Sequence, residues 1–530
     1  MQRRALFSHL SRVAAALAWQ QVFAAGPRTA VTADEHWRES ADLFPLGVAS
    51  GEPRPESVVL WTRLAPRPLQ PDGGMPPRAV PVRWEVAADA RFARVVRSGA
   101  AVAHPDAAHS VHVEVEGLLP GRTYYYRFEA GGQRSGVGRT RTAPPPDERT
   151  PRMRLALASC QHYEQGYFTA HRDMAAADVD LVLFVGDYLY GTQVPAYKRV
   201  RSHPHVMPQA LTERSVVDYR LHHAAYKLDA DLRASHAAHP WLMVWDDHEV
   251  AGDYTGLRNA ELQDPDLFVK VRTAAYQAYF EHMPLSPHRA PVGPTMALHG
   301  HYLWGQLAEF WTLDTRQYRD GAACAPGLHG PLGGKLLWRC DAADAEPRTV
   351  LGQSQGADLA AGLASSERNW KFVVQTTQIA PGLVRTPLGP LVYADGWDAY
   401  PAARRRLMEA IAQPRVPDVV CLGGDVHRHV AAALRLDPAN PASAVVASEI
   451  VTSSVTSQGL SELLTSWMKR GNPDLLHLRS DERGYTLLDV TPQQVQVEFR
   501  GTAHPVRADS RLHTQARYVI ERGTPGPRKA

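Results

Sequence analysis

The sequence predicts an α/β fold that is preceded by an all-β domain of the sandwich type. Two apolar runs, within 155–159 and at Leu181–Val185, are short, rich in Leu, Val and Ala, and lack polar/apolar alternation. Strands of this kind are buried on both faces, as in a parallel sheet covered by helices. A helix is predicted between them, at Phe168–Ala176. Upstream, about a hundred residues contain short β-like runs separated by Gly and Pro turns, which is typical of a β-sandwich.

Length and charge exclude some classes of protein. A chain of 530 residues can bury a large core, and two domains are expected at this length. The 58 Lys and Arg against 55 Asp and Glu give a net charge of +3, which does not indicate a nucleic-acid partner. No apolar run approaches the ~20 residues of a membrane span. We therefore expect neither specific nucleic-acid binding nor a membrane span.

Residues 1–25 resemble a signal for export. Paired arginines, Arg3 and Arg4, precede an apolar region at 13–19 and a small-residue ending at 22–26. This order predicts a signal peptide of the twin-arginine type, and hence a periplasmic or secreted protein that uses the twin-arginine export machinery. The structural alternative is a surface amphipathic helix.

The N-terminal β domain is predicted at 40–145. Its candidate strands lie within 42–65, at Val82–Ala87, at Val111–Val115 and within 121–128. The Pro-rich segment 142–151 then reads as a linker.

The pattern changes at Arg152, where a catalytic domain over 152–510 is predicted to begin. Further strands are expected at Leu242–Trp245, within 302–313, at Lys371–Gln375 after a helix around Glu367, at Asp418–Leu422, at Ser448–Ser454 and at Val495–Phe499. Residues 511–530 are basic and contain Pro and Gly, and we expect a solvated tail there.

Polar side chains follow four of these strands. The residues are Cys160, Asp187 with Tyr190, Asp247 with His248, and Asp425 with His427. An isolated Asp at such a place is often only a helix N-cap. Ligands of open α/β sheets, however, gather beyond the carboxyl ends of the strands, so the recurrence predicts a metal site.

The types of these side chains suit hydrolysis of phosphoesters by two metals. That chemistry needs a carboxylate that bridges two ions ~3.5–4 Å apart, with coordination positions left open for water and phosphate. Oxygen ligands suit Ca²⁺, Mg²⁺ or Mn²⁺, whereas thiolate, phenolate and imidazole suit a ferric or zinc ion.

The remaining cysteines have simpler interpretations. Cys324 and Cys340 flank a Gly-rich loop and could form a disulfide in an oxidising compartment. Cys421 lies in an apolar run and is expected in the core.

Six motifs, in order, resemble the PhoD group of alkaline phosphatases and phosphodiesterases. They are SCQ, GDYLYG, VWDDHEV, LDTRQYR, DGWDAYPAAR and GGDVH, and LGVASGEPRPESVVLWTR resembles the N-terminal β domain of that family. The resemblance covers nearly the whole mature chain. It implies a metallophosphoesterase αββα sandwich behind an Ig- or fibronectin-like β-sandwich, export by the twin-arginine route, and Fe³⁺ partnered by Ca²⁺, with Zn or Mn as alternatives.

The resemblance also assigns ligands. It implies that Asp187 bridges the metals, that Cys160, Tyr190 and His427 hold the iron, and that Asp425 belongs to the calcium site. The ligand from the DDHE region is either Asp247 or Asp253, and we favour Asp247. Asp395 and Asp398 are further candidates for calcium.

Contacts to the substrate are less well defined by the motifs. Arg316 has the planar fork that binds two phosphate oxygens, or it forms a buried salt bridge with Asp314. His248 either protonates the leaving alkoxide or hydrogen-bonds a ligand, and we prefer the second role. Glu449 with residues 452–454 either lines the mouth of the site or caps a helix.

The sequence therefore predicts an exported phosphomonoesterase or phosphodiesterase in which a metal-bound hydroxide attacks phosphorus in line. Thr192 leaves a covalent phosphoenzyme open. The substrate would be a small-molecule or polymer phosphoester, and one alternative is a phospholipase D-like or teichoic-acid-type phosphodiesterase. The others are a periplasmic metal-containing binding protein without turnover and a redox protein.

Overall fold

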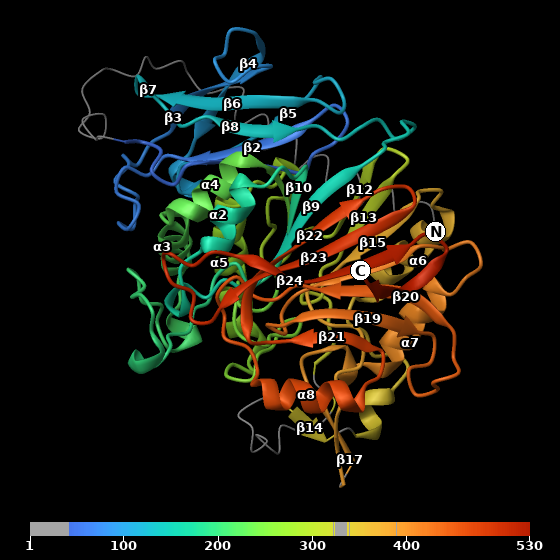
Figure 1. The fold of residues 1–530 in the computed structure, drawn as a ribbon. Coiled ribbons are helices and arrows are strands. Elements are labelled where there is room, and N and C mark those ends of the chain that lie inside the picture. Colours follow the sequence, from blue (N-terminus) through green and yellow to red (C-terminus); the bar gives the residue numbers. More distant parts are fainter. Residues whose placement is uncertain (1–41, 322, 324–335, 339, 388) are drawn as a thin grey trace, which may run out of the picture.

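The computed structural model describes residues 42–530, apart from 322, 324–335, 339 and 388, as two facing sheets covered by helices (Figure 1). The predicted export signal at 1–25 lies outside the described residues, and so does Cys324. Where the structure describes the chain, no helix is both long and apolar enough to cross a membrane.

The larger sheet has ten strands, and its centre is parallel. In spatial order they are β25 (Thr524–Lys529), β24 (His513–Glu521), β23 (Gln494–Ala503), β22 (Glu482–Val490), β9 (Met153–Ala158), β10 (Leu181–Val185), β11 (Pro240–Val244), β1 (Val48–Gly51), β2 (Val58–Arg63) and β5 (Ser110–Val115). β9, β10, β11 and β1 run parallel, and every residue of β10 and β11 is buried. This burial on both faces explains the continuous apolar runs in the sequence.

The second sheet has seven strands. They are β12 (Gly300–Trp304), β13 (Ala308–Thr312), β15 (Trp370–Val374), β18 (Val419–Gly423), β20 (Val445–Val451), β19 (His429–Arg435) and β21 (Leu475–Arg479). β13, β15, β18 and β20 are parallel, with antiparallel strands at both edges. A small sheet beside it contains β14 (Leu336–Trp338), β17 (Gly389–Tyr393) and β16 (Val384–Thr386).

Helices cover the outer faces of both sheets, which confirms the predicted αββα order. On the side of the ten-stranded sheet are α2 (Thr169–Ala176), α3 (Val216–Lys227), α4 (Ala230–Ala238) and α5 (Pro265–His282), and on the other side are α6 (Gln353–Ser365), α7 (Pro401–Ile411) and α8 (Glu462–Gly471) (Figure 1). Side chains of Ser215, Asp229, Asp264 and Ser461 cap α3, α4, α5 and α8 respectively, because each accepts hydrogen bonds from backbone N–H groups of the first turn.

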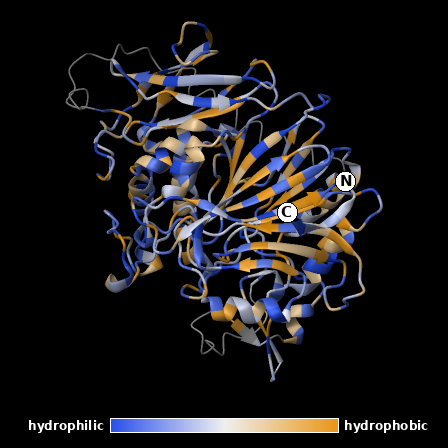
Figure 2. Ribbon diagram, viewed as in Figure 1, coloured by the Kyte–Doolittle hydropathy of each residue, from blue (hydrophilic) through white to orange (hydrophobic). Residues whose placement is uncertain are grey.

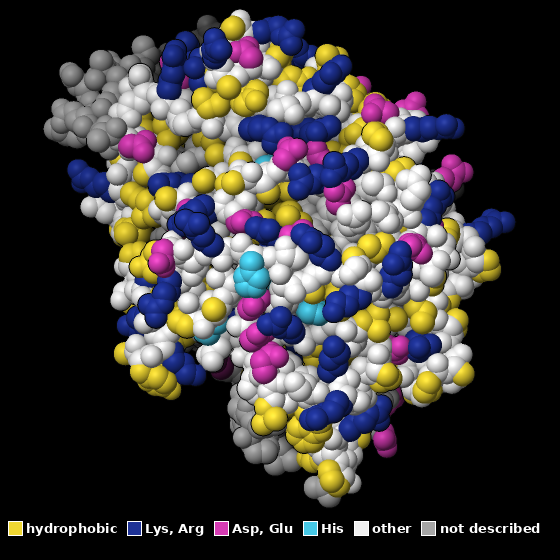
Figure 3. Space-filling model, viewed as in Figure 1, with side chains coloured by type: hydrophobic (Ala, Val, Ile, Leu, Met, Phe, Trp, Pro, Cys, Tyr) yellow, Lys and Arg dark blue, Asp and Glu magenta, His cyan; other side chains and the backbone are white. Residues whose placement is uncertain are grey.

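The main hydrophobic core lies between the two sheets. Leu155 and Phe184 of the larger sheet belong to the same buried cluster as Phe310, Phe372 and Val420 of the smaller one. The rings of Phe310 and Phe372 stack with centroids 5.1 Å apart. Apolar residues follow the strands of both sheets in Figure 2. On the face of the molecule that Figure 3 shows, Asp and Glu lie among the Lys and Arg side chains.

The N-terminal strands form a β-sandwich that shares a sheet with the rest of the molecule. Its second layer consists of β4 (Val95–Ala103), β3 (Val80–Ala87), β6 (Thr123–Ala130), β7 (Gln133–Arg134) and β8 (Gly138–Arg141), which faces β1, β2 and β5 across a separate core. β1 pairs with β11 in parallel, with Ser50 opposite Pro240 and Gly51 opposite Trp241. A Cβ at Gly51 would lie 2.2 Å from the Pro284 carbonyl oxygen, so only glycine fits at this junction.

The structure corrects the prediction for the C-terminus. Residues 511–530 are not a solvated tail, because β24 and β25 extend the ten-stranded sheet. Arg517 pairs with Glu498 and Arg528 with Glu521, so the basic side chains have partners on the sheet. Tyr518 and Ile520 are buried in the core. The basic composition of this segment therefore led to the wrong prediction for β24 and β25.

One local prediction changes, and another is confirmed. The helix expected around Glu367 ends earlier, since α6 stops at Ser365 and β15 begins at Trp370. Cys421 lies fully buried in β18 as a free thiol, which confirms its place in the core. Cys340 is disulfide-bonded.

Candidate metal centre and active site

The predicted ligands meet at the carboxyl ends of parallel strands from both sheets. Cys160 follows β9, Asp187 follows β10 and Asp247 follows β11, all in the ten-stranded sheet. Asp425 and His427 follow β18 of the facing sheet. The site is therefore built where the two sheets bring their strand ends together, as expected for ligands of open α/β sheets.

Strained backbone is concentrated at this place. Cys160, Asp187, Asp253, Asp425 and His427 have φ values of 60°, 58°, 54°, 61° and 51°. A positive φ is uncommon for a residue with a Cβ, and such strain persists mainly at functional sites. The strained backbone therefore indicates that these residues form a functional site.

One group of side chains combines sulfur, nitrogen and oxygen ligands. The ligand atoms of Cys160, Asp187 and His427 all lie within 4.8 Å of one another. The Tyr190 hydroxyl lies 2.7 Å from Asp187 Oδ2 and 3.1 Å from His427 Nε2. All the residues that the resemblance assigns to iron are therefore brought together.

Three further groups consist mainly of carboxylates. They are Asp187 with Asp246 and Asp425, Asp187 with Asp247 and His248, and Asp247 with Asp253 and Asp395, each within 4.8 Å. Asp187 belongs to both kinds of group, which is the position a bridging carboxylate must occupy.

The two rivals from the DDHE region lie side by side. Asp247 Oδ2 accepts a hydrogen bond of 2.5 Å from the Asp253 backbone N–H, and both carboxylates join the group with Asp395. Asp398 is not part of the centre, because its carboxylate pairs with Arg404 and accepts a hydrogen bond from Gly382 N.

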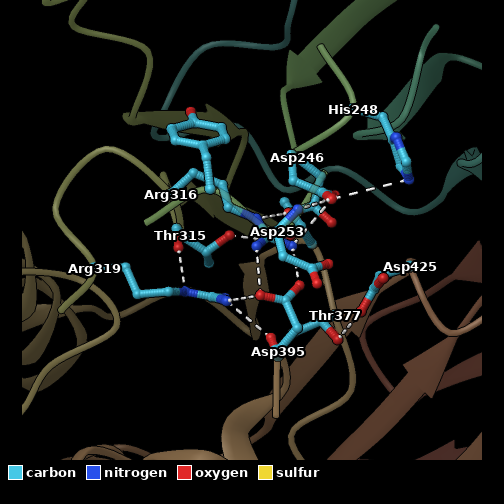
Figure 4. Close-up of polar contacts among 12 residues, drawn as sticks. Asp246, His248, Asp253, Thr315, Arg316, Arg319, Thr377, Asp395 and Asp425 are labelled. Atoms are coloured by element: carbon cyan, nitrogen blue, oxygen red, sulfur yellow. Dashed lines mark hydrogen bonds and ion pairs between the residues drawn. The ribbon is translucent and has the colours of Figure 1, made fainter. Parts of the chain in front are cut away.

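Arg316 does not present its guanidinium as a phosphate site. Its side chain is fully buried, with Nε bonded to Asp246 Oδ1 at 2.5 Å and Nη1 and Nη2 bonded to the two Asp395 oxygens at 2.7 and 2.6 Å (Figure 4). The alternative salt bridge with Asp314 is also absent from the contacts of this side chain, since Asp314 accepts from the Arg316 backbone N–H instead. The planar fork is therefore occupied by carboxylates of the centre itself.

His248 lies over the phenol ring of Tyr190. The ring centroids are 4.1 Å apart, and His248 Nε2 is 3.9 Å from Asp247 Oδ2. The side chain is 25% exposed, which places it at the open side of the centre. Thr192 lines a small cavity beside Tyr190 together with His162, His203 and His222.

Glu449 and residues 452–454 do not line the opening of the candidate site. Glu449 is fully buried and accepts hydrogen bonds from the backbone N–H groups of Ile379 and Ala380, at 2.5 and 2.8 Å. Thr452, Ser453 and Ser454 are fully buried as well. These residues support the loops behind the centre and cap no helix.

Sequence reasoning missed three residues that shape the centre. Asp246 accepts a hydrogen bond from Arg316 Nε, and Thr377 donates a hydrogen bond to Asp425. Glu249 accepts hydrogen bonds from the backbone N–H groups of Asp187, Tyr188 and Asp246 at 3.2, 2.6 and 2.9 Å. The DDHE motif contains two of the three, but only the fold reveals what they contact.

Crowded acidic groups make the site strongly electronegative. Burial, followed by the charges of Asp247 and Asp246, raises the pKa of Asp187 well above its usual value. Burial, and then Asp187, likewise raises the pKa of the Cys160 thiol and of the Tyr190 phenol. Burial lowers the pKa of His427 to about 3, so its imidazole is neutral and able to ligate. Cations would offset this charge and favour the ionised ligands, so the donor set fits a metal centre.

Comparisons with known proteins agree with this arrangement. Residues 155–499 match the family model for the PhoD-like phosphatase, and residues 29–144 match the model for its N-terminal domain. The chain is 42% identical over 491 residues to alkaline phosphatase D of Bacillus subtilis (strain 168), which covers 92% of this chain and 82% of that protein.

A solved structure gives the same result. The structure of PhoD superposes with a TM-score of 0.85 at 40% sequence identity, covering 92% of both chains. Together, the two sheets, the strand-end ligands, the family models and these relatives show that the chain belongs to the PhoD-like phosphatase family and is a phosphoester hydrolase.

Proposed function

We propose that this protein is an exported, metal-dependent phosphoesterase of the alkaline phosphatase D type, which hydrolyses phosphomonoesters, phosphodiesters or both. The observation that carries the proposal is the position of Asp187, which is shared between a sulfur- and nitrogen-containing ligand group and a carboxylate group. Hydrolysis by paired cations requires such a shared carboxylate.

The two ligand groups differ in the ions that they suit. Cys160, Tyr190 and His427 with Asp187 would hold Fe³⁺, and zinc would also suit this set. Asp187 with Asp247, Asp253 and Asp425 would hold Ca²⁺, with Mn²⁺ as the alternative, and Asp395 extends this carboxylate group. When bound, such cations would neutralise charge on a phosphoryl group and activate water for attack.

The chain itself orients these ligands. The Gln458 carbonyl oxygen lies 2.8 Å from His427 Nδ1 and accepts a hydrogen bond from it, which leaves the Nε2 lone pair directed toward Tyr190 and the centre. Glu249 fixes the backbone at Asp187. Arg316 fixes Asp246 and Asp395, so we assign it a positioning role instead of a phosphate contact.

His248 is the group best placed to move a proton. It lies at the partly exposed side of the centre, next to Asp247 and Tyr190. There it either donates a proton to the departing alkoxide or hydrogen-bonds Asp247. A variant, His248→Asn, separates the two roles, because loss of a proton donor would penalise alkyl esters more than aryl esters, whose leaving groups need less protonation.

The decisive experiment measures hydrolysis of an aryl phosphomonoester and an aryl phosphodiester in parallel, with and without a calcium chelator. Turnover that the chelator suppresses and added Ca²⁺ restores is the expected result, and the preferred ester defines the substrate class. Failure to hydrolyse either ester, in protein shown by elemental analysis to contain its metals, would instead support a metal-containing binding protein.

A further inference from the structure

Arg483, the second residue of β22, is a fully buried arginine behind the centre. The hydrogen bonds that it donates all end on uncharged oxygens. Nη1 bonds to the carbonyl oxygens of His427 and Ser457 at 3.0 and 2.7 Å and to Ser454 Oγ at 2.8 Å, and Nη2 bonds to the Ser480 carbonyl oxygen. Burying a guanidinium is costly unless hydrogen bonds or opposite charges compensate for its lost hydration.

These oxygens belong to three different loops. His427 follows β18, Ser454 and Ser457 follow β20, and Ser480 precedes β22. The chain passes very close to the contact, since a Cβ at Gly459 would lie 2.5 Å from the His427 carbonyl oxygen and 3.1 Å from Arg483 Nη1. One planar side chain therefore ties together three segments that the sequence separates.

The loop after β20 in turn holds two predicted iron ligands. Ser457 Oγ donates to the Cys160 carbonyl oxygen at 2.9 Å, and Val455 N–H donates to the Ser159 carbonyl oxygen at 2.9 Å. The next residue, Gln458, accepts the hydrogen bond from His427 Nδ1. Because Arg483 binds both this loop and the His427 carbonyl, it fixes the position of Cys160 relative to His427.

We propose that Arg483 is a positioning residue for the metal subsite of Cys160 and His427, which it sets through its hydrogen bonds to three loops. This inference rests on the proposed function, since it concerns how firmly that subsite holds its ion. Supporting groups of this kind typically change metal affinity by about 10–100-fold when they are removed.

The test compares Arg483→Met, which removes these hydrogen bonds, with Arg483→Lys, whose single ammonium group replaces only part of them. Arg63→Met is the matched control, because Arg63 is also buried and also hydrogen-bonds a carbonyl oxygen, that of Ala108, but lies in β2. For each purified protein, the metal content per chain and the rate of metal release into a chelator are measured, together with the visible absorption spectrum and thermal unfolding.

We expect Arg483→Met to release its thiolate-bound transition metal at least about tenfold faster than wild type while the calcium content is unchanged, with Arg483→Lys intermediate. Arg63→Met should lower the unfolding temperature without changing metal release. Wild-type metal content and release in a folded Arg483→Met protein would overturn the inference. Absence of any bound metal in the wild-type protein would refute the proposed function itself, so the two failures are distinguishable.

Discussion

Asp187 is the residue on which the proposed chemistry depends most. It is buried, has a φ of 58° and belongs to three of the ligand groups. Asn has almost the same shape as Asp but a neutral amide, so Asp187→Asn removes the shared negative charge without creating a cavity.

For Asp187→Asn we expect activity to fall by more than about 100-fold, beyond the usual effect of losing an outer supporting group, with the circular dichroism spectrum unchanged. Steady-state kinetics on an aryl phosphate measures the loss. Asp398→Asn is the control, since Asp398 is a buried carboxylate that pairs with Arg404 outside the centre. Near-normal turnover of Asp187→Asn would remove its bridging role.

Tyr190 provides a test of metal identity. A phenolate bound to Fe³⁺ gives a visible absorption band, so the loaded protein should be coloured and Tyr190→Phe should lose that band. Tyr188→Phe is the matched control, because the Tyr188 hydroxyl bonds to His236, away from the ligands. A colourless and fully active wild-type protein would exclude ferric iron and favour zinc.

Arg316 distinguishes a positioning role from substrate binding. Its buried ion pairs with Asp246 and Asp395 predict that Arg316→Met lowers the free energy of unfolding by about 3–5 kcal/mol, because unpaired carboxylates remain buried. Urea unfolding and elemental analysis measure stability and metal content. A direct phosphate contact would have a different signature, a raised KM with stability unchanged.

At the scale of elements, α3, α4 and α5 contain an unusual number of buried histidines. His222, His223, His236 and His282 are almost completely buried, and burial lowers the pKa of each well below 6.5. The folded protein therefore keeps them neutral, while the unfolded chain binds protons below about pH 6.5.

We expect the protein to lose stability as the pH falls below about 6.5, by up to about 1.4 kcal/mol per pH unit for each such histidine. Urea midpoints at pH 7.5, 6.5 and 5.5 measure the slope. Neither ring nitrogen of His223 has a hydrogen-bond partner, so His223→Phe should fold and reduce the slope. An unchanged slope in this variant would assign the acid sensitivity to other groups.

The same helices show where prediction from sequence stops. β10 was predictable because every one of its residues is apolar and buried. The buried faces of α3 and α5 instead include His222, His223, Arg272 and Glu281, so their apolar periodicity is weak. The prediction of a solvated tail at 511–530 was wrong for a related reason. In a sequence, arginines that pair with carboxylates across strands cannot be told from solvated charges.

The candidate site follows the same rule. Cys160, Asp187 and Asp425 could be identified because each comes two residues after the end of a strand that is recognisable by itself. The pairing of Arg316 with Asp246 spans 70 residues, and that with Asp395 spans 79. No local pattern encodes such contacts, so only the assembled sheets reveal that the guanidinium is already occupied.

For the molecule as a whole, the proposal of export can be tested directly. Replacing Arg3 and Arg4 together by Lys should retain the protein in the cytoplasm, because the twin-arginine route reads the paired arginines. Fractionation followed by immunodetection measures the distribution, and Arg28→Lys is the control outside the predicted signal. Unchanged export of the double variant would point to another route.

The pairing of distant strands has a consequence for biosynthesis. β1 pairs with β11 about 190 residues later, and β9 has β22 as its other neighbour, with Leu157 opposite Thr486. Contacts between such distant segments form late and slowly. Nearly the entire polypeptide must therefore be synthesised before the central sheet can form completely and bring His427 next to Cys160. If the chain were secreted unfolded, the proposed metal ions would have to bind outside the cytoplasm. If it is exported only after folding, the ions can bind in the cytoplasm first.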